Sequence, residues 1–296
     1  MASPLDMVSA GDGTNRLFVA DQNGRVFVIQ NGEMLGGLFL DVTGRIVSPL
    51  GIGGSHDVND FDERGLLGLA LHTGFANPDS AGYQKLYTYT SEPDAGSPDF
   101  TTDPAPNSVD HQSVIAEWVV DAGDPNRVDV ASRREIMRID QPQFNHNAGM
   151  LVFGPDDYLY IALGDGGGAD DTGDGHGEMG NGQNIETVHG SILRIDPLGP
   201  SFTVGSGDAT STNGAYRIAW DNPFVGTVGV DEIFAYGFRN PFRFTYDCQT
   251  DMFVVADVGQ NQIEEVDILQ KGGNFGWNLK EGSFAFNFED GTVSEP

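Results

Sequence analysis

The segment best suited to acid–base chemistry is Asn145-His146-Asn147-Ala148-Gly149, which precedes a short apolar run at residues 150–153. A histidine at the entrance to a strand can act as a base, because its ordinary pKa lies near neutrality. The neighbouring glycine allows a ligand to approach the backbone closely. The sequence leaves open the alternative of a structural histidine that is hydrogen-bonded inside the fold.

A second candidate is Arg239, which lies in the stretch Gly237-Phe-Arg-Asn-Pro-Phe-Arg243. A guanidinium on a turn stiffened by proline can bind a carboxylate or an oxyanion of a ligand with two hydrogen bonds. Asn240 adds an amide donor beside it. The alternative is an ordinary ion pair, since the chain has 44 Asp and Glu residues to 15 Lys and Arg.

Two further segments could hold cations. In Asp257-Val-Gly259-Gln260 the main-chain carbonyls are candidates for binding a hard cation such as Ca²⁺, and the alternative is a plain turn followed by solvated glutamates. The stretch 164–181 is rich in glycine and aspartate, which suits calcium, but its spacing is not that of an EF-hand loop. A solvated surface loop is the competing interpretation, so a second calcium between Asp170 and Asn181 stays open.

The elements that must position these side chains are predicted to be strands. Residues 16–20 and 25–29 flank an Asn-Gly turn and indicate a hairpin, and the stretches 85–90, 158–163 and 251–256 are short aromatic and β-branched runs. Only residues 130–134 suggest a turn or two of helix. The chain is therefore expected to be all-β, a β-propeller with a two-sheet sandwich as the alternative. Its chemistry is expected on the long connections 48–64, 92–112, 164–190 and 257–275.

Composition narrows the functional classes. The formal net charge is −29, which argues against nucleic-acid binding, and no run of 18 apolar residues is present to span a membrane. The single cysteine cannot form an internal disulfide. Strong acidity fits an extracellular or periplasmic protein, because net charge keeps a protein soluble where salt screens its self-repulsion.

Seven motifs in order resemble those of the glucose/sorbosone dehydrogenase family, the soluble six-bladed β-propellers that use pyrroloquinoline quinone (PQQ) and calcium. They extend over nearly the whole chain. The matching stretches are Glu63-Arg-Gly-Leu-Leu-Gly-Leu-Ala-Leu-His72, Asn145-His-Asn-Ala-Gly149 with the following Leu-Val-Phe-Gly-Pro-Asp156, Gly190-Ser-Ile-Leu-Arg-Ile-Asp196, Asp221-Asn-Pro-Phe224, Gly237-Phe-Arg-Asn-Pro-Phe-Arg243, Asp257-Val-Gly-Gln260 and Gly273-Asn-Phe-Gly-Trp277.

The resemblance implies a role for each matching position. His146 corresponds to the catalytic base that takes the proton of the sugar anomeric hydroxyl while hydride passes to the quinone. Arg239 corresponds to the arginine that stabilises the developing oxyanion. The resemblance also implies PQQ contacts at Glu63, Asn145 and Asn240, and calcium held by the carbonyls of Gly259 and Gln260, next to the PQQ.

Two departures from the family pattern matter. Gln260 stands where well-studied members carry proline, a change that keeps the carbonyl and loosens the turn. The sequence ends at Pro296, where the family continues for about one or two more blades. We therefore expect one propeller domain over residues 1–296 that is truncated at its C-terminus and holds about four blades in an open arc. The exposed sheet edges of such an arc favour a homodimer.

Three functions follow as hypotheses. The first is PQQ- and calcium-dependent oxidation of aldose sugars, or related hydroxyl compounds, to lactones, with an external electron acceptor. The second is a non-catalytic propeller that binds a glycan or protein partner, similar to Hedgehog-interacting protein. The third is a calcium-dependent lactonase, which needs several carboxylates converging on one metal ion.

Overall fold

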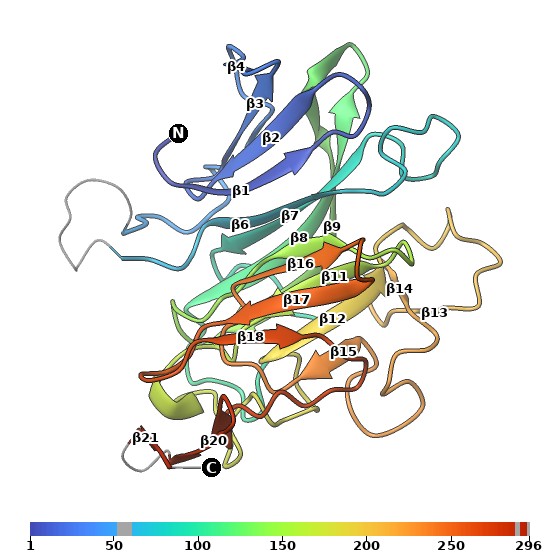
Figure 1. The fold of residues 1–296 in the computed structure, drawn as a ribbon. Helices are drawn as coiled ribbons and strands as arrows, with labels where there is room; N and C mark the ends of the chain where they lie inside the picture. The colour runs from blue at the N-terminus through green and yellow to red at the C-terminus, as the bar shows by residue number, and fades with distance from the viewer. Residues whose placement is uncertain (52–60, 288–290, 295–296) are drawn as a thin grey trace.

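The computed structural model describes residues 1–51, 61–287 and 291–294, which form five antiparallel sheets that follow one another along the chain (Figure 1). The first sheet contains the predicted hairpin, in which Asp21 lies opposite Arg25. Its strands are β1 (Pro4–Ser9), β2 (Arg16–Asp21), β3 (Arg25–Gln30), β4 (Glu33–Met34) and β5 (Leu40–Asp41). The second sheet has the order β6 (Leu66–Leu71), β7 (Lys85–Glu92), β8 (His111–Asp121) and β9 (Asp124–Gln141).

The third and fourth sheets carry most of the candidate residues on their connections. The third consists of β10 (Leu151–Phe153), β11 (Leu159–Leu163), β12 (Ser191–Asp196), β13 (Ala209–Thr210), β14 (Arg217–Ile218) and β15 (Ile233–Tyr236). The fourth consists of β16 (Arg243–Asp247), β17 (Met252–Asp257) and β18 (Glu265–Ile268), and a small fifth sheet of β19 (Lys280–Glu281), β20 (Phe284–Asn287) and β21 (Thr292–Val293). In the described residues the one helical element is the short 3₁₀ turn η1 (Ala169–Asp171).

The first four sheets pack face to face in chain order, and each consecutive pair of them encloses an apolar core. The alternating side chains of β11 show this: Leu159, Ile161 and Leu163 join the core shared with the second sheet, whereas Tyr160 and Ala162 join the core shared with the fourth. The first strands of successive sheets also contact one another, β1 with β6, β6 with β10 and β10 with β16. This is the radial order of propeller blades, and it rules out the two-sheet sandwich.

Two local predictions are wrong. Residues 130–134, expected as a turn of helix, lie within β9, where Arg134 is opposite Glu117 of β8 and forms an ion pair with it at 2.9 Å. Cross-strand pairing here outweighs the local helix preference. The connection 257–275 is not a continuous loop, because it contains β18. Part of the predicted connection 48–64, residues 52–60, lies outside the described residues.

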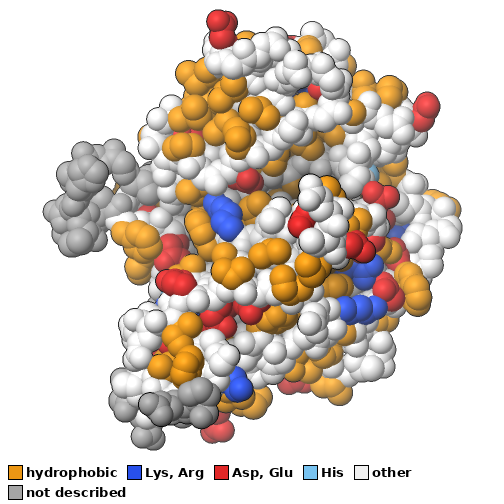
Figure 2. Space-filling model, in the orientation of Figure 1, with side chains coloured by type: hydrophobic (Ala, Val, Ile, Leu, Met, Phe, Trp, Pro, Cys, Tyr) orange, Lys and Arg blue, Asp and Glu red, His pale blue; other side chains and the backbone are white. Residues whose placement is uncertain are grey.

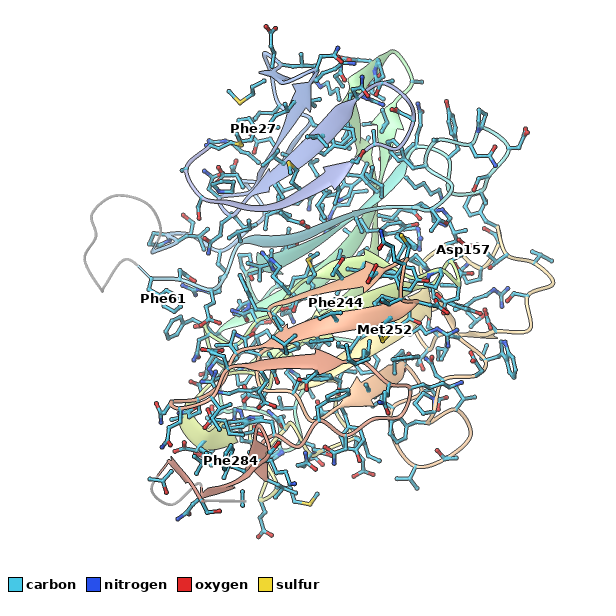
Figure 3. All side chains as sticks on the ribbon, in the orientation of Figure 1. Phe27, Phe61, Asp157, Phe244, Met252 and Phe284 are labelled. Atoms are coloured by element: carbon cyan, nitrogen blue, oxygen red, sulfur yellow. The ribbon has the colours of Figure 1, made fainter. Side chains whose placement is uncertain are left out.

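The candidate residues share one end of the sheets. Glu63, His146 and Arg239 each stand a few residues before the first strand of a sheet: β6, β10 and β16. Figure 3 labels Phe61, next to this end, at the left and Asp157, in the β10–β11 turn, at the right. Because each first strand starts at the same end, the loops of three sheets can meet there.

Candidate active site

His146 and Asp165 meet because β10 and β11 form an antiparallel hairpin. Leu151 lies opposite Ile161, so the segment that enters β10 lies beside the segment that leaves β11. His146 Nδ1 is 2.7 Å from Asp165 Oδ1, and both side chains are buried. The structure therefore gives this histidine a carboxylate partner rather than a solvent-facing position.

The charge state of Asp165 fixes the tautomer of the histidine. Burial raises the pKa of Asp165, but the neighbouring His146 and the Arg239 charge outweigh burial and bring the pKa below its ordinary value. An ionised carboxylate only accepts hydrogen bonds, so Nδ1 carries the proton and Nε2 keeps its lone pair. No described residue forms a hydrogen bond with Nε2, which leaves it free to accept a substrate proton.

Asp165 is itself held by two further donors. Trp277 Nε1 donates to Oδ2 at 2.8 Å, and the Gly167 N–H donates to Oδ1 at 2.9 Å. These contacts fix the carboxylate and, through it, the imidazole plane. Sequence reasoning did not assign Asp165 a role, although its place directly after the strand that pairs with β10 was a usable signal.

Arg239 is positioned by the equivalent hairpin of the fourth sheet. Arg243 lies opposite Ala256, so the residues before β16 meet those after β17. Arg239 Nε donates to Gln260 Oε1 at 2.9 Å and NH1 donates to the Val258 carbonyl at 3.0 Å. Its guanidinium also lies over the Trp277 ring, 5.6 Å from the centroid. Gln260, the departure from the usual proline, thus contributes a side-chain contact to this arginine.

A second buried carboxylate, Asp257, supports the backbone of the arginine segment. Its oxygens accept the N–H groups of Arg239 and Asn240 at 2.9 and 2.7 Å. Burial raises the pKa of Asp257 to about 8, although both backbone hydrogen bonds act in the opposite direction. Asp257 therefore holds the loop in place without a charged partner of its own.

The histidine and arginine segments touch each other through residues 164 and 165. The Asp165 N–H donates to the Arg239 carbonyl at 2.8 Å. A side chain at Gly164 would bring a Cβ within 2.0 Å of the His146 carbonyl oxygen and 3.1 Å of the Arg239 carbonyl oxygen. Glycine is required there because the three backbones are in contact.

Glu63, from the segment before β6, and Asn240, from the arginine segment, connect the histidine and arginine segments by hydrogen bonds. Glu63 Oε2 accepts the His146 N–H at 2.5 Å and the Asn240 side-chain amide at 3.3 Å, and Asn240 Oδ1 accepts the Ala148 N–H at 2.9 Å. Asn145 Oδ1 is buried and has no hydrogen-bond partner in the described chain. This oxygen is therefore available to accept a hydrogen bond from a bound molecule.

Gly149 serves packing rather than ligand approach. Its φ is +93°, and a Cβ there would lie 2.5 Å from Leu67 Cβ. The absent side chain lets the His146 segment lie against β6, where Gly68 in turn would place a Cβ 2.2 Å from the Gly149 carbonyl oxygen. The expectation that this glycine admits a ligand is therefore wrong.

The turn at Gly259 and Gln260 presents two carbonyls on one side. Glu281 Oε1 accepts the N–H groups of Gln260 at 2.6 Å and Asn261 at 3.2 Å. In a trans peptide the carbonyl points away from the N–H of the same unit, so the carbonyls of 259 and 260 both point away from Glu281. Neither carbonyl accepts a hydrogen bond from the described residues. This pair of oxygens fits a hard cation, and the buried, unpartnered Oε2 of Glu281 adds negative charge nearby.

The stretch 164–181 is not the solvated surface loop that was the competing interpretation. Asp165, Asp171 and His176 are all buried and lie close together. Asn181, at its end, is buried as well and donates its side-chain amide to the carbonyls of Asp165 and Gly175 at 2.8 and 3.1 Å. Glycines let this loop fold back on itself beneath the histidine.

The surface reflects the acidic composition. On the face drawn in Figure 2, Lys and Arg side chains cover little of the area, and acidic side chains are scattered among apolar and polar ones. In the described residues, no helix has the length and apolar character needed to cross a membrane.

Known proteins resemble the chain over most of its length. HIPL1 protein of Arabidopsis thaliana is 34% identical over 309 residues, which cover 97% of this chain and 43% of HIPL1. Hedgehog-interacting protein of Mus musculus is 32% identical over 250 residues, which cover 83% of this chain and 30% of that protein. The chain thus spans less than half the length of either relative.

The fold matches solved propellers. The PQQ-bound aldose sugar dehydrogenase of Streptomyces coelicolor superposes with a TM-score of 0.64 at 21% identity, covering 96% of this chain and 64% of that one. The all-β propeller prediction is confirmed. The sequence model of the family described as Glucose / Sorbosone dehydrogenase matches residues 1–294. The predicted family is therefore confirmed: the chain belongs to the glucose/sorbosone dehydrogenase family.

Proposed function

We propose that this site oxidises aldose sugars, or related hydroxyl compounds, to lactones with PQQ and calcium as cofactors. The observation that carries the proposal is the convergence of His146, its partner Asp165 and Arg239 at one end of the third and fourth sheets. A base oriented by a carboxylate, next to a fixed guanidinium, is the arrangement that removal of a hydroxyl proton requires.

The chain's own residues account for the proton transfer. His146 Nε2 takes the proton of the substrate hydroxyl, because Nδ1–H is held by Asp165 at 2.7 Å. The imidazolium that results is stabilised by the same carboxylate, which stays ionised. Burial of the His146 side chain limits competition from water. Arg239 supplies positive charge where an oxyanion develops.

The cofactors would bind beside these groups. We assign PQQ contacts to Glu63, Asn145 and Asn240, and calcium to the carbonyls of Gly259 and Gln260. When bound, PQQ supplies the acceptor for the two electrons of the substrate, and calcium anchors and polarises it. The electrons then leave to an external acceptor.

The proposal also covers the domain that carries the site and its location. We infer that the five sheets belong to one propeller domain over residues 1–296, and that its open sheet edges are covered by a second copy of the chain. An acidic protein of this family fits the extracellular space or the periplasm.

The test combines cofactor binding with turnover. The chain is titrated with PQQ in the presence of Ca²⁺, and reduction of an artificial dye is followed across a panel of aldoses. His146→Gln should lower kcat by about 10²- to 10⁴-fold with PQQ affinity nearly unchanged. His72→Gln, which removes a buried imidazole directly after β6, is the matched control. Dye reduction that is equal in both variants would refute the assigned base.

Partner binding is the second candidate function. The relatives HIPL1 and Hedgehog-interacting protein are 34% and 32% identical to this chain, against 28% for quinoprotein glucose dehydrogenase B of Acinetobacter calcoaceticus. If the chain binds no PQQ in calorimetry with Ca²⁺ present, yet binds a glycan or a secreted protein, this function replaces the enzymatic one.

A further inference from the structure

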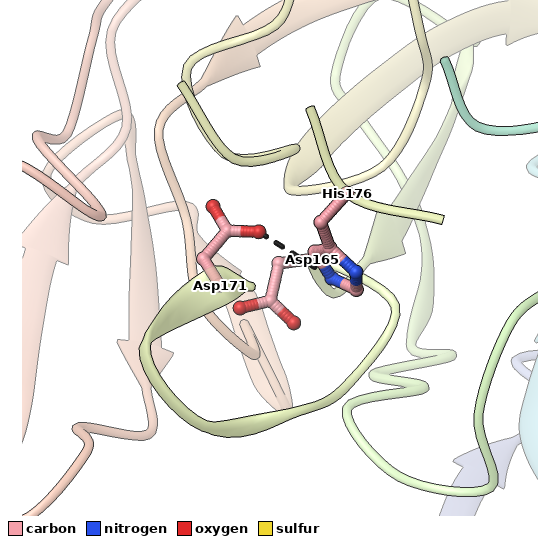
Figure 4. A group of neighbouring side chains, drawn as sticks. All are labelled: Asp165, Asp171 and His176. Atoms are coloured by element: carbon pink, nitrogen blue, oxygen red, sulfur yellow. Dashed lines mark ion pairs between the residues drawn. The ribbon is translucent and has the colours of Figure 1, made fainter. Parts of the chain in front are cut away.

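Three side chains on the connection between β11 and β12 are gathered around one point, as Figure 4 shows. Asp165 follows β11, Asp171 ends η1, and His176 lies in the loop beyond. One ligand atom from each lies within 4.8 Å of the other two, and all three residues are buried. We propose that Asp165, Asp171 and His176 bind a divalent transition-metal ion, separate from the carbonyl turn at 259–260.

His176 supplies the independent observation, since its Nε2 atom is buried without a hydrogen-bond partner in the described chain. Nδ1 is 3.1 Å from the Asp174 carbonyl, which can only accept, so Nδ1 carries the proton. Nε2 then presents a lone pair into the cluster, 3.5 Å from Asp171 Oδ1. Two lone pairs that face each other in a buried site repel, and a metal ion between them would accept both.

The charges of the cluster also favour a divalent cation. Within the part of the chain that the structure describes, the Asp171 oxygens accept hydrogen bonds from two backbone N–H groups, those of Asn181 and Gly182, at 2.8 and 2.9 Å. With a metal ion bound, both carboxylates are ionised and the imidazole is neutral, so a divalent ion balances the two negative charges.

Ligand type selects the class of ion. Calcium and magnesium prefer oxygen ligands, whereas a nitrogen with two carboxylates suits Zn²⁺, Mn²⁺ or Co²⁺. The 3.5 Å between His176 Nε2 and Asp171 Oδ1 is close to the edge of a zinc tetrahedron, about 3.3 Å for bonds of about 2.0 Å. The other ligand atoms lie within 4.8 Å of one another, so closing to the edge of a zinc tetrahedron takes at most about 1.5 Å of movement.

The position of the cluster connects the proposed ion to His146. Asp165 is shared between the proposed ion and His146, which it holds at 2.7 Å. A bound cation would therefore fix the loop that orients the histidine and draw charge from its carboxylate partner. The metal site needs neither PQQ nor turnover, so metal binding can be tested separately from the proposed enzyme activity.

The test uses the metal-stripped full chain, with PQQ absent. Calorimetric titration at pH 7 with Zn²⁺ should give one site, with weaker binding of Ca²⁺, and Co²⁺ should produce visible absorption bands. His176→Gln and Asp171→Asn should each weaken Zn²⁺ binding by at least about 100-fold, and His72→Gln should leave it unchanged. Two variants are used, with folding checked by circular dichroism, because one of them could fail to fold.

Three results would overturn the metal site. Binding of neither Zn²⁺ nor Co²⁺ by the wild type would do so, as would Ca²⁺ binding that is tighter than Zn²⁺ binding and is lost in His176→Gln, because calcium at the 259–260 turn does not depend on that side chain. Zn²⁺ binding of equal strength in the wild type and in a folded His176→Gln or Asp171→Asn variant would also do so, because the ion would then lie elsewhere.

Discussion

Asp165 and Asp257 occupy similar places in neighbouring sheets but have opposite electrostatics. Asp165 follows β11 and Asp257 ends β17, so each stands where the second strand of a sheet reaches the site. Both are buried and both accept hydrogen bonds from the protein. The pKa of Asp165 is lowered, whereas burial raises the pKa of Asp257 to about 8.

The difference comes from what each carboxylate faces. Burial raises the pKa of Asp165, but the hydrogen bond from His146, the nearby Arg239 charge and the Gly167 N–H together outweigh burial. Asp257 receives only backbone N–H groups, and the charges of Glu265 and Asp165 add to the effect of burial. Burial alone therefore does not decide ionisation; a buried carboxylate stays charged where it has cationic partners. One aspartate is fit to orient a base, and the other to hold a backbone.

The largest effect is expected from Asp165→Ala. The variant leaves His146 Nδ1–H and Trp277 Nε1–H buried without their acceptor, so the free energy of unfolding should fall by about 3–5 kcal/mol. Urea denaturation at pH 7 measures the change. The exposed Asp79→Ala is the control, expected within about 0.5 kcal/mol of the wild type. Equal stabilities of the two variants would contradict the pairing.

The pH dependence of the free energy of unfolding distinguishes Asp257 from Asp165. Between the ordinary carboxyl pKa and about 8, folded Asp257 holds a proton that the unfolded chain has lost, so stability falls as pH rises. The slope is at most about 1.4 kcal/mol per pH unit. Asp257→Asn should remove this slope over the range. Asp165 has a lowered pKa, so its contribution is present at neutral pH and is lost only as pH falls through the acid range.

Denaturation curves for wild type, Asp257→Asn and Asp165→Asn at a series of pH values separate the two carboxylates. Parallel pH profiles of wild type and Asp257→Asn between about pH 4 and 8 would show that Asp257 is ionised in the fold.

A smaller effect is expected from Trp277→Phe. The variant keeps a ring beside Arg239 but removes the 2.8 Å hydrogen bond to Asp165, so unfolding should become easier by about 1–3 kcal/mol. Trp220→Phe, at a side chain that is 67% exposed, is the matched control. If both tryptophan variants lose the same stability, the indole does not anchor Asp165.

The smallest effect is expected from Gln260→Ala, which removes the 2.9 Å hydrogen bond from Arg239 Nε. The neighbouring carbonyl of Val258 still holds the guanidinium, so the loss should be about 0.5–1.5 kcal/mol. Gln262→Ala, an exposed glutamine in the same turn, should change nothing measurable. A loss in Gln262→Ala equal to that in Gln260→Ala would mean that the turn, and not the arginine contact, is affected.

Local pattern predicted much of the fold correctly. The hairpin at 16–29 and the strands near 85–90, 158–163 and 251–256 all form, because short β-rich runs next to tight turns need little information from elsewhere. The prediction of a helical turn at residues 130–134 was wrong because these residues lie in β9, which is held by pairing with β8 and by the ion pair of Arg134 with Glu117. The sandwich alternative failed since no local signal tells how sheets pack on one another.

By itself the sequence determined the strands, the family and the two residues, His146 and Arg239, that carry the proposed chemistry. Only the tertiary structure decided their partners. Trp277 reaches Asp165 across 112 residues, and Glu281 reaches the turn at Gln260 from the fifth sheet. Such contacts depend on how separate sheets stack, which is set by the burial of apolar faces on both sides of strands such as β11 and not by the local spacing of polar residues.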